Sequence, residues 1–466
     1  MLKADIDRIY RAQVAYKETV KHTSVKNRQS WLRILLSHIT AAERSIEYAL
    51  YTDFHKSSTE TAVTELLAVR WELRNIIKSL PKWMRDKRLP RTMKMPNVRA
   101  YLHYEPKGNS LIITPWNYPF LLPLVHLAAS VAAGNTVILK LSEHSPKTNE
   151  IIRKIVSEVF PEEHVAIVEG DSSSSTHLLK LKFDHIHFTG SQEVGKIVAK
   201  AAAEHLCEVT LELGGKSPAI VDRNVNLKRV VKNLIWAKFI NAGQTCIASD
   251  YLLVHRHLRQ EIETTFKTEI ENAFGKNPLH SPDYARLINI AQFDRLDNVL
   301  QEAIVSGANV ISGGQRDRHL KYIAPTVLSN VSKNSDLLQK EIFGPILPIV
   351  YYGHIQEAID YINARPKPLA LYIFSNDPLF GRHILRHTTA GSTCINDAMI
   401  QIMHPHLPFG GVNHSGTGKS LGHYGYKSFS HERAVAEAQI HPLSSIFWYP
   451  YTERTNTVLQ WLNKLF

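Results

Sequence analysis

The sequence predicts an α/β protein built from two open, doubly wound parallel-sheet domains. From Ser110 onward, short apolar runs alternate with amphipathic segments. Strands that alternate with helices of about 10 to 15 residues are typical of a parallel sheet covered by helices on both faces. The alternation forms two sets, which meet near Gly214 and Gly215. The chain has 466 residues, about three times a typical domain length, so more than one core is expected.

The first hundred residues follow a helical pattern instead. Residues 3–80 carry charged faces and apolar stripes, and long amphipathic helices are expected at 28–50 and 58–80. Residues 98–104 alternate imperfectly and predict an extended arm. Between the helices and the arm stand three prolines that are expected to break the chain: Pro81, Pro90 and Pro96.

The two alternating sets give the expected order of strands and helices. The first set predicts strands at 111–113, 136–140, 165–168, 185–188 and 208–213, with helices through 133, over 146–160 and from 191. The second set predicts strands at 219–221, 251–254, 346–352, 370–374 and 392–396, with helices ending at 240 and spanning 257–274. The four serines at 172–175 are expected to form a loop.

The last forty residues are less regular. Residues 434–440 predict a strand, and 452–466 predict an amphipathic helix. Its apolar side is expected to pack on its own domain or on a dimer partner rather than on a membrane, although peripheral membrane contact stays open.

The positive net charge is compatible with three kinds of partner. The formal net charge is +12, which suits nucleic acid, an acidic membrane surface or anionic ligands. The charges are spread out, and no dense Lys/Arg block carries interleaved aromatic residues. We therefore predict a phosphate-bearing cofactor, a solvated basic surface and no nucleic-acid partner.

Cysteine and histidine usage predicts neither disulfides nor a metal. Cys207, Cys246 and Cys394 are too few and too far apart for a disulfide framework or a zinc site. None of the 24 histidines falls in a His-Glu-x-x-His pattern. A reducing, cytoplasmic compartment is expected.

The longest apolar run, 120–133, is shorter than the about 20 residues of a membrane helix, so no transmembrane segment is predicted. No signal peptide is expected at the start.

A short polar turn, Asn-Ala-Gly-Gln-Thr-Cys, ends at Cys246. Its glycine lets the backbone turn tightly, so a thiol and nearby amides can face a carbonyl group, as a nucleophilic cysteine requires. The alternative is a small buried hydrophobe, the commoner role of a lone cysteine. Glu212 lies in an apolar strand just before Gly214 and Gly215, where an isolated carboxylate is costly to bury. Together the two residues favour a catalytic site.

These segments resemble a known family. Residues 211–218 (Leu-Glu-Leu-Gly-Gly-Lys-Ser-Pro) and 243–246 (Gly-Gln-Thr-Cys) are similar to the two active-site signatures of aldehyde dehydrogenases. The resemblance runs from about residue 31 to residue 435. The segment 395–397 and the loop at His404 resemble the shorter, dimeric class 3 branch, which includes fatty-aldehyde enzymes. The hydrophobic membrane anchor of some such members is not expected here.

The resemblance implies roles in the chemistry for a few residues. Cys246 would be the nucleophile, and Glu212 would activate water. Asn117, between Pro115 and Pro119, would form the oxyanion hole with the backbone amide of Cys246. Tyr118 would line the substrate pocket.

The resemblance also implies a dinucleotide site. Gly190, Ser191 and Gly195 mark a strand-to-helix turn whose free amides suit a pyrophosphate. This turn is not the usual Gly-x-Gly-x-x-Gly pattern, and by itself it would equally suit a helix cap. Lys140 and Glu143 would hold the adenine ribose, although this chain has Leu141 where the family usually has proline.

Glu341 would bind the nicotinamide ribose, with Phe343 packed beside it. The remaining residues of the predicted cofactor site are Thr114, Pro115, Trp116 and Leu213. Because the Glu143 carboxylate favours a free 2′-hydroxyl, NAD is expected, with NADP left open.

The sequence therefore predicts an NAD(P)-dependent oxidation of an aldehyde, medium- to long-chain aliphatic or aromatic, to a carboxylic acid through a cysteine thiohemiacetal and thioester. The predicted enzyme is a homodimer. Two alternatives remain: an enzyme that releases the acyl group to coenzyme A or runs as a reductase, and an inactive scaffold. Glu212 argues against the first, and the presence of both Cys246 and Glu212 argues against the second. The predicted domains are 1–90 with 105–213 for the dinucleotide, 214–410 for catalysis, 91–104 with 425–440 as an oligomerisation arm, and 441–466 as a tail.

Overall fold

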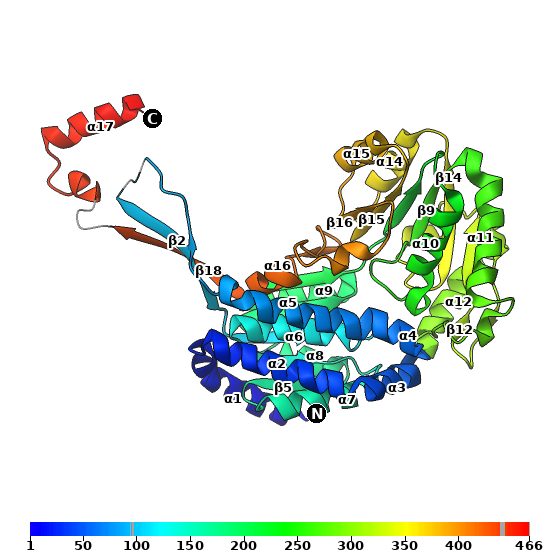
Figure 1. Cartoon of the computed structure of the whole chain (residues 1–466), viewed down its shortest axis with the longest axis horizontal. Coiled ribbons are helices and arrows are strands. Elements are labelled where there is room, and N and C mark those ends of the chain that lie inside the picture. The colour runs from blue at the N-terminus through cyan, green and yellow to red at the C-terminus, as the bar shows by residue number, and fades with distance from the viewer. Residues whose placement is uncertain (94, 96, 439–442, 466) are drawn as a thin grey trace.

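The computed structural model describes residues 1–93, 95, 97–438 and 443–465. Two helix-covered sheets form two lobes, and a ribbon of strands leads away from the first lobe to the C-terminal helix (Figure 1). The predicted fold class, an α/β protein with doubly wound parallel sheets, is confirmed.

The first sheet has the strand order β17-β7-β6-β3-β4-β5. All neighbours are parallel except β17, which pairs antiparallel with β7. Chain order reverses between β3 and β6, and ligands of open α/β sheets bind at the carboxyl ends beside such a reversal. The strands are β3 (Asn109–Ile113), β4 (Thr136–Lys140), β5 (Val165–Val168), β6 (His185–Gly190), β7 (Glu208–Leu213) and β17 (Gly416–Thr417).

Helices cover both faces of this sheet. One face packs on α1 (Lys3–Lys21), α8 (Ser172–Leu178) and α9 (Gln192–Glu204). The other packs on α2 (Val25–Ala41), α3 (Glu43–Phe54), α5 (Leu67–Trp83), α6 (Leu121–Ala133) and α7 (Pro146–Val159). Successive strand residues such as Leu111 and Ile112 enter opposite clusters, as the two-residue period of a strand requires.

The second sheet has the order β10-β13-β14-β9-β8-β15-β16, with β10 antiparallel at one edge. Its strands are β8 (Pro218–Val221), β9 (Tyr251–His255), β10 (Asn309–Ser312), β13 (Thr326–Ser329), β14 (Ile346–Tyr352), β15 (Ala370–Phe374) and β16 (Ser392–Ile395). One face packs on α10 (Leu227–Phe239), α11 (Arg259–Phe274) and α12 (Ile290–Val305), and the other on α14 (Ile355–Asn363) and α15 (Pro378–His387). Short elements beside this sheet are β11 (Arg316–Asp317), β12 (Tyr322–Ile323) and α13 (Asp336–Gln339). Strands β10 and β13 were not predicted from the sequence.

A three-stranded antiparallel ribbon projects from the first lobe (Figure 1). It consists of β1 (Lys87–Arg88), β2 (Val98–Pro106) and β18 (Ser430–Ala438), and α17 (Glu453–Leu465) follows it. The short helix α16 (Gly422–Ser428) joins the ribbon to the lobe by packing on α5 and α6. The predicted strand at 434–440 begins earlier than expected, and residues 439 and 440, like Phe466 of the predicted last helix, lie outside the described residues.

The sequence predicts one continuous helix over 28–50, but the structure has two helices there. The chain bends at Ala42, where α2 ends and α3 begins. The bend lets α3 pack on α7, whereas α2 also packs on α5 and α6. Such a change of partner leaves no trace in the apolar period.

Two other local expectations are also corrected. Pro81 does not break its helix but lies inside α5, two residues before its end. The carbonyl of Ile77, which a proline four residues later leaves without its helical partner, accepts a hydrogen bond from Gln29 Nε2 at 2.6 Å instead. The serines at 172–175 form the start of α8 rather than a loop, because the Asp171 carboxylate caps the helix by accepting from Ser173 N at 2.9 Å.

Candidate active site

The turn before Cys246 has a strained backbone. After α10, Asn241, Ala242 and Gly243 all adopt positive φ angles of 52°, 50° and 76°. For residues other than glycine this conformation costs about 1 kcal/mol or more. Gly243 has no alternative, because a Cβ there would overlap the carbonyl oxygen of Gly344. The turn therefore needs outside contacts to hold it.

The buried side chain of Gln244 supplies three of these contacts. Its Nε2 donates to Asn241 O at 2.9 Å and to Arg286 O at 3.1 Å, and its Oε1 accepts from Ile288 N at 3.0 Å. With both ends of its amide bonded, Gln244 fixes the turn against the neighbouring chain.

Cys246 follows this turn as a partly exposed thiol. The backbone N–H groups of Cys246 and Ile247 face its sulfur. Burial, together with the nearby carboxyls of Glu341 and Glu212, raises the pKa of the Cys246 thiol to about 12. The thiol is therefore neutral at physiological pH and needs a base to become a nucleophile.

Glu212 lies near the end of β7, opposite Gly416 of β17. It is 4% exposed, and its Oε1 accepts a hydrogen bond from Ser420 Oγ at 2.8 Å. Its Oε2 is buried without a hydrogen-bond partner among the described residues. Burial raises the pKa of Glu212 to about 8, against the opposing effects of Ser420 and Lys419, so this carboxyl can exchange a proton near neutral pH.

Asn117 and Tyr118 lie in the loop between β3 and α6, against the cysteine turn. Asn117 Nδ2 donates to Gln244 O at 3.1 Å, and Tyr118 Oη lies 2.6 Å from Thr245 Oγ1. Both residues are buried. The loop after β3 is thus bonded directly to the segment that ends at Cys246.

One cavity of about 950 Å³ joins these groups. Its lining includes eleven of the residues that the sequence predicted: Pro115, Trp116, Asn117, Tyr118, Gly190, Ser191, Glu212, Leu213, Cys246, Glu341 and Phe343. The other four predicted site residues lie outside this lining: Thr114, Lys140, Glu143 and Gly195.

At the reversal between β3 and β6, the cavity reaches the start of α9. Ser191 caps this helix by accepting from Val194 N at 3.3 Å. Gln192 and Glu193, whose amides precede Val194 and have no partner within the helix, line the cavity. Thr189 Oγ1 has no hydrogen-bond partner within the part of the chain that the structure describes. Gly195 lets α9 approach the sheet, because a Cβ there would meet the Leu213 side chain at 2.7 Å. Free amides and an unpaired hydroxyl fit a dinucleotide phosphate.

Lys140 and Glu143 follow the adjacent strand β4. Lys140 is buried, and its Nζ donates to Leu141 O at 2.6 Å and lies 3.9 Å from Glu143 Oε2. Burial lowers the pKa of Lys140. The Glu143 side chain is 42% exposed at the carboxyl edge of the sheet, where it can accept hydrogen bonds from a ligand.

Glu341 and Phe343 close the other side of the cavity. The Glu341 carboxyl accepts from the Gly215 amide, and burial raises its pKa to about 8. It lies over Gly214, where a Cβ would overlap it. Phe343 packs edge-on against Trp116 with ring centroids 5.4 Å apart. The double glycine before β8 therefore makes room for this glutamate.

Sequence reasoning missed several residues of the site. Ser420 and Lys419 act on Glu212 from a segment more than 200 residues away, which returns to the sheet with β17, and no local signal marks them. Much of the apolar lining also went unpredicted: Val63, Trp71, Leu121, Leu122, Trp236, Ile240, Ile402, Met403 and Phe409.

Two negative findings apply to the described residues. None of their helices is both long and apolar enough to cross a membrane. Within the same ranges, no three His, Cys, Asp or Glu side chains are grouped so that they could hold a metal ion.

Comparisons with known proteins agree with this geometry. Residues 1–435 match the model of the aldehyde dehydrogenase family, so the match starts earlier than the resemblance read from the sequence. Human aldehyde dehydrogenase family 3 member B1 is 42% identical over 83% of this chain and 81% of its own. The rat enzyme named aldehyde dehydrogenase, dimeric NADP-preferring, is 39% identical over 92% and 93%. A solved structure described as the substrate-bound state of Staphylococcus aureus AldH is 36% identical, with a TM-score of 0.94 over 98% and 99%.

Proposed function

Because this chain belongs to the aldehyde dehydrogenase family and is an NAD(P)-dependent aldehyde dehydrogenase, we propose that Cys246, Asn117 and Glu212 perform its chemistry. The observation that carries the proposal is that all three line one cavity. Glu212 keeps one carboxyl oxygen free of hydrogen bonds there, within the described residues.

In the first half-reaction, Cys246 gives up its proton and its sulfur bonds to the aldehyde carbon. This proton passes to Glu212, which is close enough to raise the pKa of the thiol, or to a water molecule in the cavity. The negative oxygen is held by the Asn117 amide and the Cys246 N–H. These donors are fixed before the substrate binds, because the Asn117 loop is already bonded to the cysteine turn.

NAD(P), when bound, accepts the hydride that leaves the carbon. The start of α9 and Thr189 are suited to its pyrophosphate, Lys140 and Glu143 to the adenine ribose, and Glu341 to the nicotinamide ribose. Trp116, Phe343 and Leu213 would pack beside it, with Thr114 and Pro115 completing the strand end.

In the second half-reaction, Glu212 takes a proton from water, and the oxygen attacks the thioester on Cys246. Burial holds the pKa of Glu212 near 8, which makes it a stronger base than an exposed glutamate. The acid leaves and the thiol is regenerated. A coenzyme A-dependent enzyme would have no use for such a base, which is why hydrolysis is the proposed outcome.

The apolar part of the lining supports medium- to long-chain aliphatic or aromatic aldehydes as substrates. Tyr118, Leu122, Trp236 and Met403 line the cavity and offer carbon surface. Each buried methylene contributes about 0.8 kcal/mol, so kcat/KM is expected to rise about fourfold per carbon until the pocket is full. Absorbance at 340 nm, followed across aldehydes of increasing length with and without coenzyme A, measures this. If no aldehyde produces a rise, the proposed function is wrong.

For the cofactor, we propose a preference for NAD that depends on Glu143. Its carboxylate can bond both ribose hydroxyls and repels a 2′-phosphate, so wild-type kcat/KM should be larger with NAD than with NADP. In Glu143→Gln the ratio should fall roughly tenfold, as the loss of one charge-assisted hydrogen bond implies. Kinetics with both cofactors measures the ratio.

The matched control for this prediction is Glu150→Gln. Glu150 lies on α7, where it pairs with Lys147 at 2.9 Å on the surface, so its replacement should leave the ratio unchanged. An NADP-preferring wild type would show that Glu143 does not face the ribose.

We also propose that the enzyme is a homodimer and that it is cytoplasmic. The projecting ribbon of β2 and β18 (Figure 1) offers exposed strand surface that suits the proposed homodimer contact, and the rat relative is named dimeric. We propose a cytoplasmic location from the three unpaired cysteines.

A further inference from the structure

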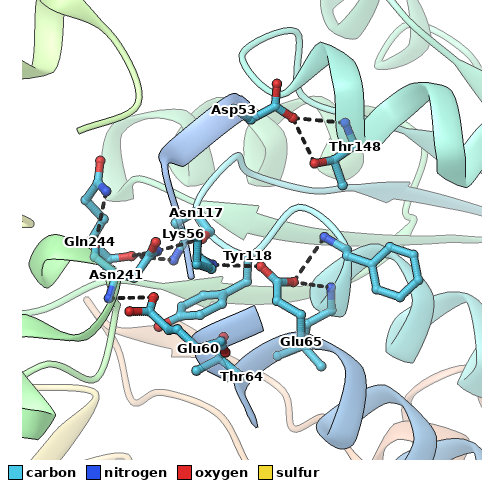
Figure 2. Close-up of polar contacts among 12 residues, drawn as sticks. Asp53, Lys56, Glu60, Thr64, Glu65, Asn117, Tyr118, Thr148, Asn241 and Gln244 are labelled. Carbon is cyan, nitrogen blue, oxygen red and sulfur yellow. Dashed lines mark hydrogen bonds and ion pairs between the residues drawn. The ribbon is translucent and has the colours of Figure 1, made fainter. Parts of the chain in front are cut away.

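A cluster of charged side chains borders the segments that carry Asn117 and Cys246. Lys56, Glu60 and Glu65, here the Lys56 cluster, come from the chain between α3 and α5 and lie around Tyr118, with Glu60 beside Asn241 of the cysteine turn (Figure 2). Lys56 and Glu65 have no exposed surface and pair at 2.9 Å. Burying charges is costly unless they make good hydrogen bonds, so the cluster needs an explanation.

The local backbone brings the two glutamates to the same side. Ser57 caps the short helix α4 (Ser58–Thr61) by accepting from Glu60 N at 3.1 Å. The chain then forms a π-helix, η1 (Ala62–Leu66), before α5. In an α-helix of about 3.6 residues per turn, side chains five residues apart point in different directions. A π-helix bonds each residue to the fifth one along, which turns side chains at this spacing, here Glu60 and Glu65, toward the same side. Such π segments occur frequently at functional sites.

Glu65 supports the loop that carries Asn117. Its Oε2 accepts hydrogen bonds from Phe120 N at 3.2 Å and Leu121 N at 2.7 Å, at the start of α6. Lys56 Nζ also lies 4.7 Å from the centre of the Tyr118 ring. One side of the active site is thus fixed to the Lys56 cluster.

Glu60 supports the other side, the strained turn. Its Oε1 accepts from Asn241 N at 2.9 Å, at the first residue with positive φ. The Asn241 side chain in turn donates to Asn117 O at 2.7 Å and to Gln244 O at 3.2 Å (Figure 2). Asn241 therefore joins Glu60 to both segments that form the oxyanion hole.

We propose that Glu60 is a positioning residue: by accepting the Asn241 N–H, it holds the left-handed turn that sets the Asn117 amide and the Cys246 N–H at a fixed separation. This inference rests on the proposed function of Asn117 and Cys246. An oxygen that accepts the Asn241 N–H, whether charged or neutral, satisfies the first amide of a turn that is unfavourable by itself.

Glutamine should be able to replace Glu60. Burial raises the pKa of Glu60 to about 7, with Lys56 and the Asn241 N–H opposing this effect and Glu65 and Asp283 adding to it. Protonated and ionised forms both keep an oxygen for Asn241. Glu60 also borders a separate cavity of about 450 Å³ with Asp283 and Lys232, where the glutamine NH₂ can be accommodated.

The test compares Glu60→Ala with Glu60→Gln in the intact enzyme. Rapid mixing with NAD and aldehyde measures the rate of NADH formation in the first turnover. Glu60→Ala should slow this step at least tenfold at saturating substrate, with KM for NAD within twofold of wild type. Glu60→Gln should recover to within threefold of wild type. If the alanine variant is insoluble, Glu60→Leu fills the space without an acceptor and should be equally slow.

The matched control is Asp53→Ala, or Asp53→Asn if alanine does not fold. Asp53 is a buried carboxylate near the end of α3, and like Glu60 it accepts from a backbone amide, Thr148 N at 2.9 Å at the start of α7, away from the turn (Figure 2). Its variant should lower Tm but leave the first-turnover rate within twofold of wild type.

Three results would overturn the proposal: a Glu60→Ala rate within threefold of wild type, a Glu60→Gln enzyme as slow as Glu60→Ala, or equal slowing by the Asp53 variant. Wild-type enzyme that forms no NADH would instead disprove the proposed function, so the two failures can be told apart.

Discussion

Cys246→Ala is expected to abolish aldehyde oxidation, with a loss of at least about 10³-fold in kcat, while NAD affinity stays near wild type. The thiol forms the bond to substrate, and alanine offers no replacement nucleophile. The residues suited to the pyrophosphate and the adenine ribose lie around α9 and β4, away from the sulfur. Steady-state kinetics at 340 nm and cofactor titration by fluorescence measure the two effects.

The other two cysteines provide the controls. Cys394 is buried in β16, and Cys207 is half-buried before β7, with its Sγ 3.5 Å from Glu208 O. Neither lines the cavity, so Cys207→Ala and Cys394→Ala should keep most of the activity. A Cys246→Ala enzyme within tenfold of wild type would show that the nucleophile has been misassigned.

The parts of the site that the sequence could predict are those with strong local signals. Cys246 follows a glycine turn, and Glu212 is a carboxylate in an otherwise apolar strand. The five parallel strands of the first sheet, β3 to β7, were each read from their own run of residues, and the parallel order then gathers their ends at one edge. The antiparallel strand β17 was not predicted. For Asn117, Glu341 and Phe343, the expected roles came from the family resemblance alone.

The parts that escaped prediction depend on distant partners. Ser420 bonds Glu212 across 208 residues, and Glu60 bonds Asn241 across 181. A serine after Lys419, or a glutamate in an amphipathic helix, looks like an ordinary solvated residue in the sequence. Likewise, Pro81 is tolerated only because Gln29 satisfies Ile77 O. Tertiary contacts decide all three cases, and no short window of sequence contains them.

Glu212→Gln should separate the two half-reactions. Glutamine keeps the shape of the side chain but cannot accept a proton, so the thioester should still form and then accumulate on Cys246. We expect a burst of about one NADH per subunit followed by a slow steady rate, the kinetic sign of a trapped covalent intermediate. The steady rate should fall at least about 10²-fold, in the range typical of a lost general base. Rapid mixing and mass measurement of the acylated protein detect both.

The pH dependence tests the same assignment independently. A general base must be ionised to act, and burial raises the pKa of Glu212 to about 8, so the wild-type steady rate should rise with pH through about 8 and level off above it. Glu212→Gln should lose this rise. If Glu212 also takes the proton from Cys246, the burst of Glu212→Gln will be slower than the first turnover of the wild type. The rate of this burst will then rise with hydroxide concentration. If Glu212→Gln shows the full wild-type steady rate and no burst, Glu212 is not the hydrolytic base, and another group activates the water.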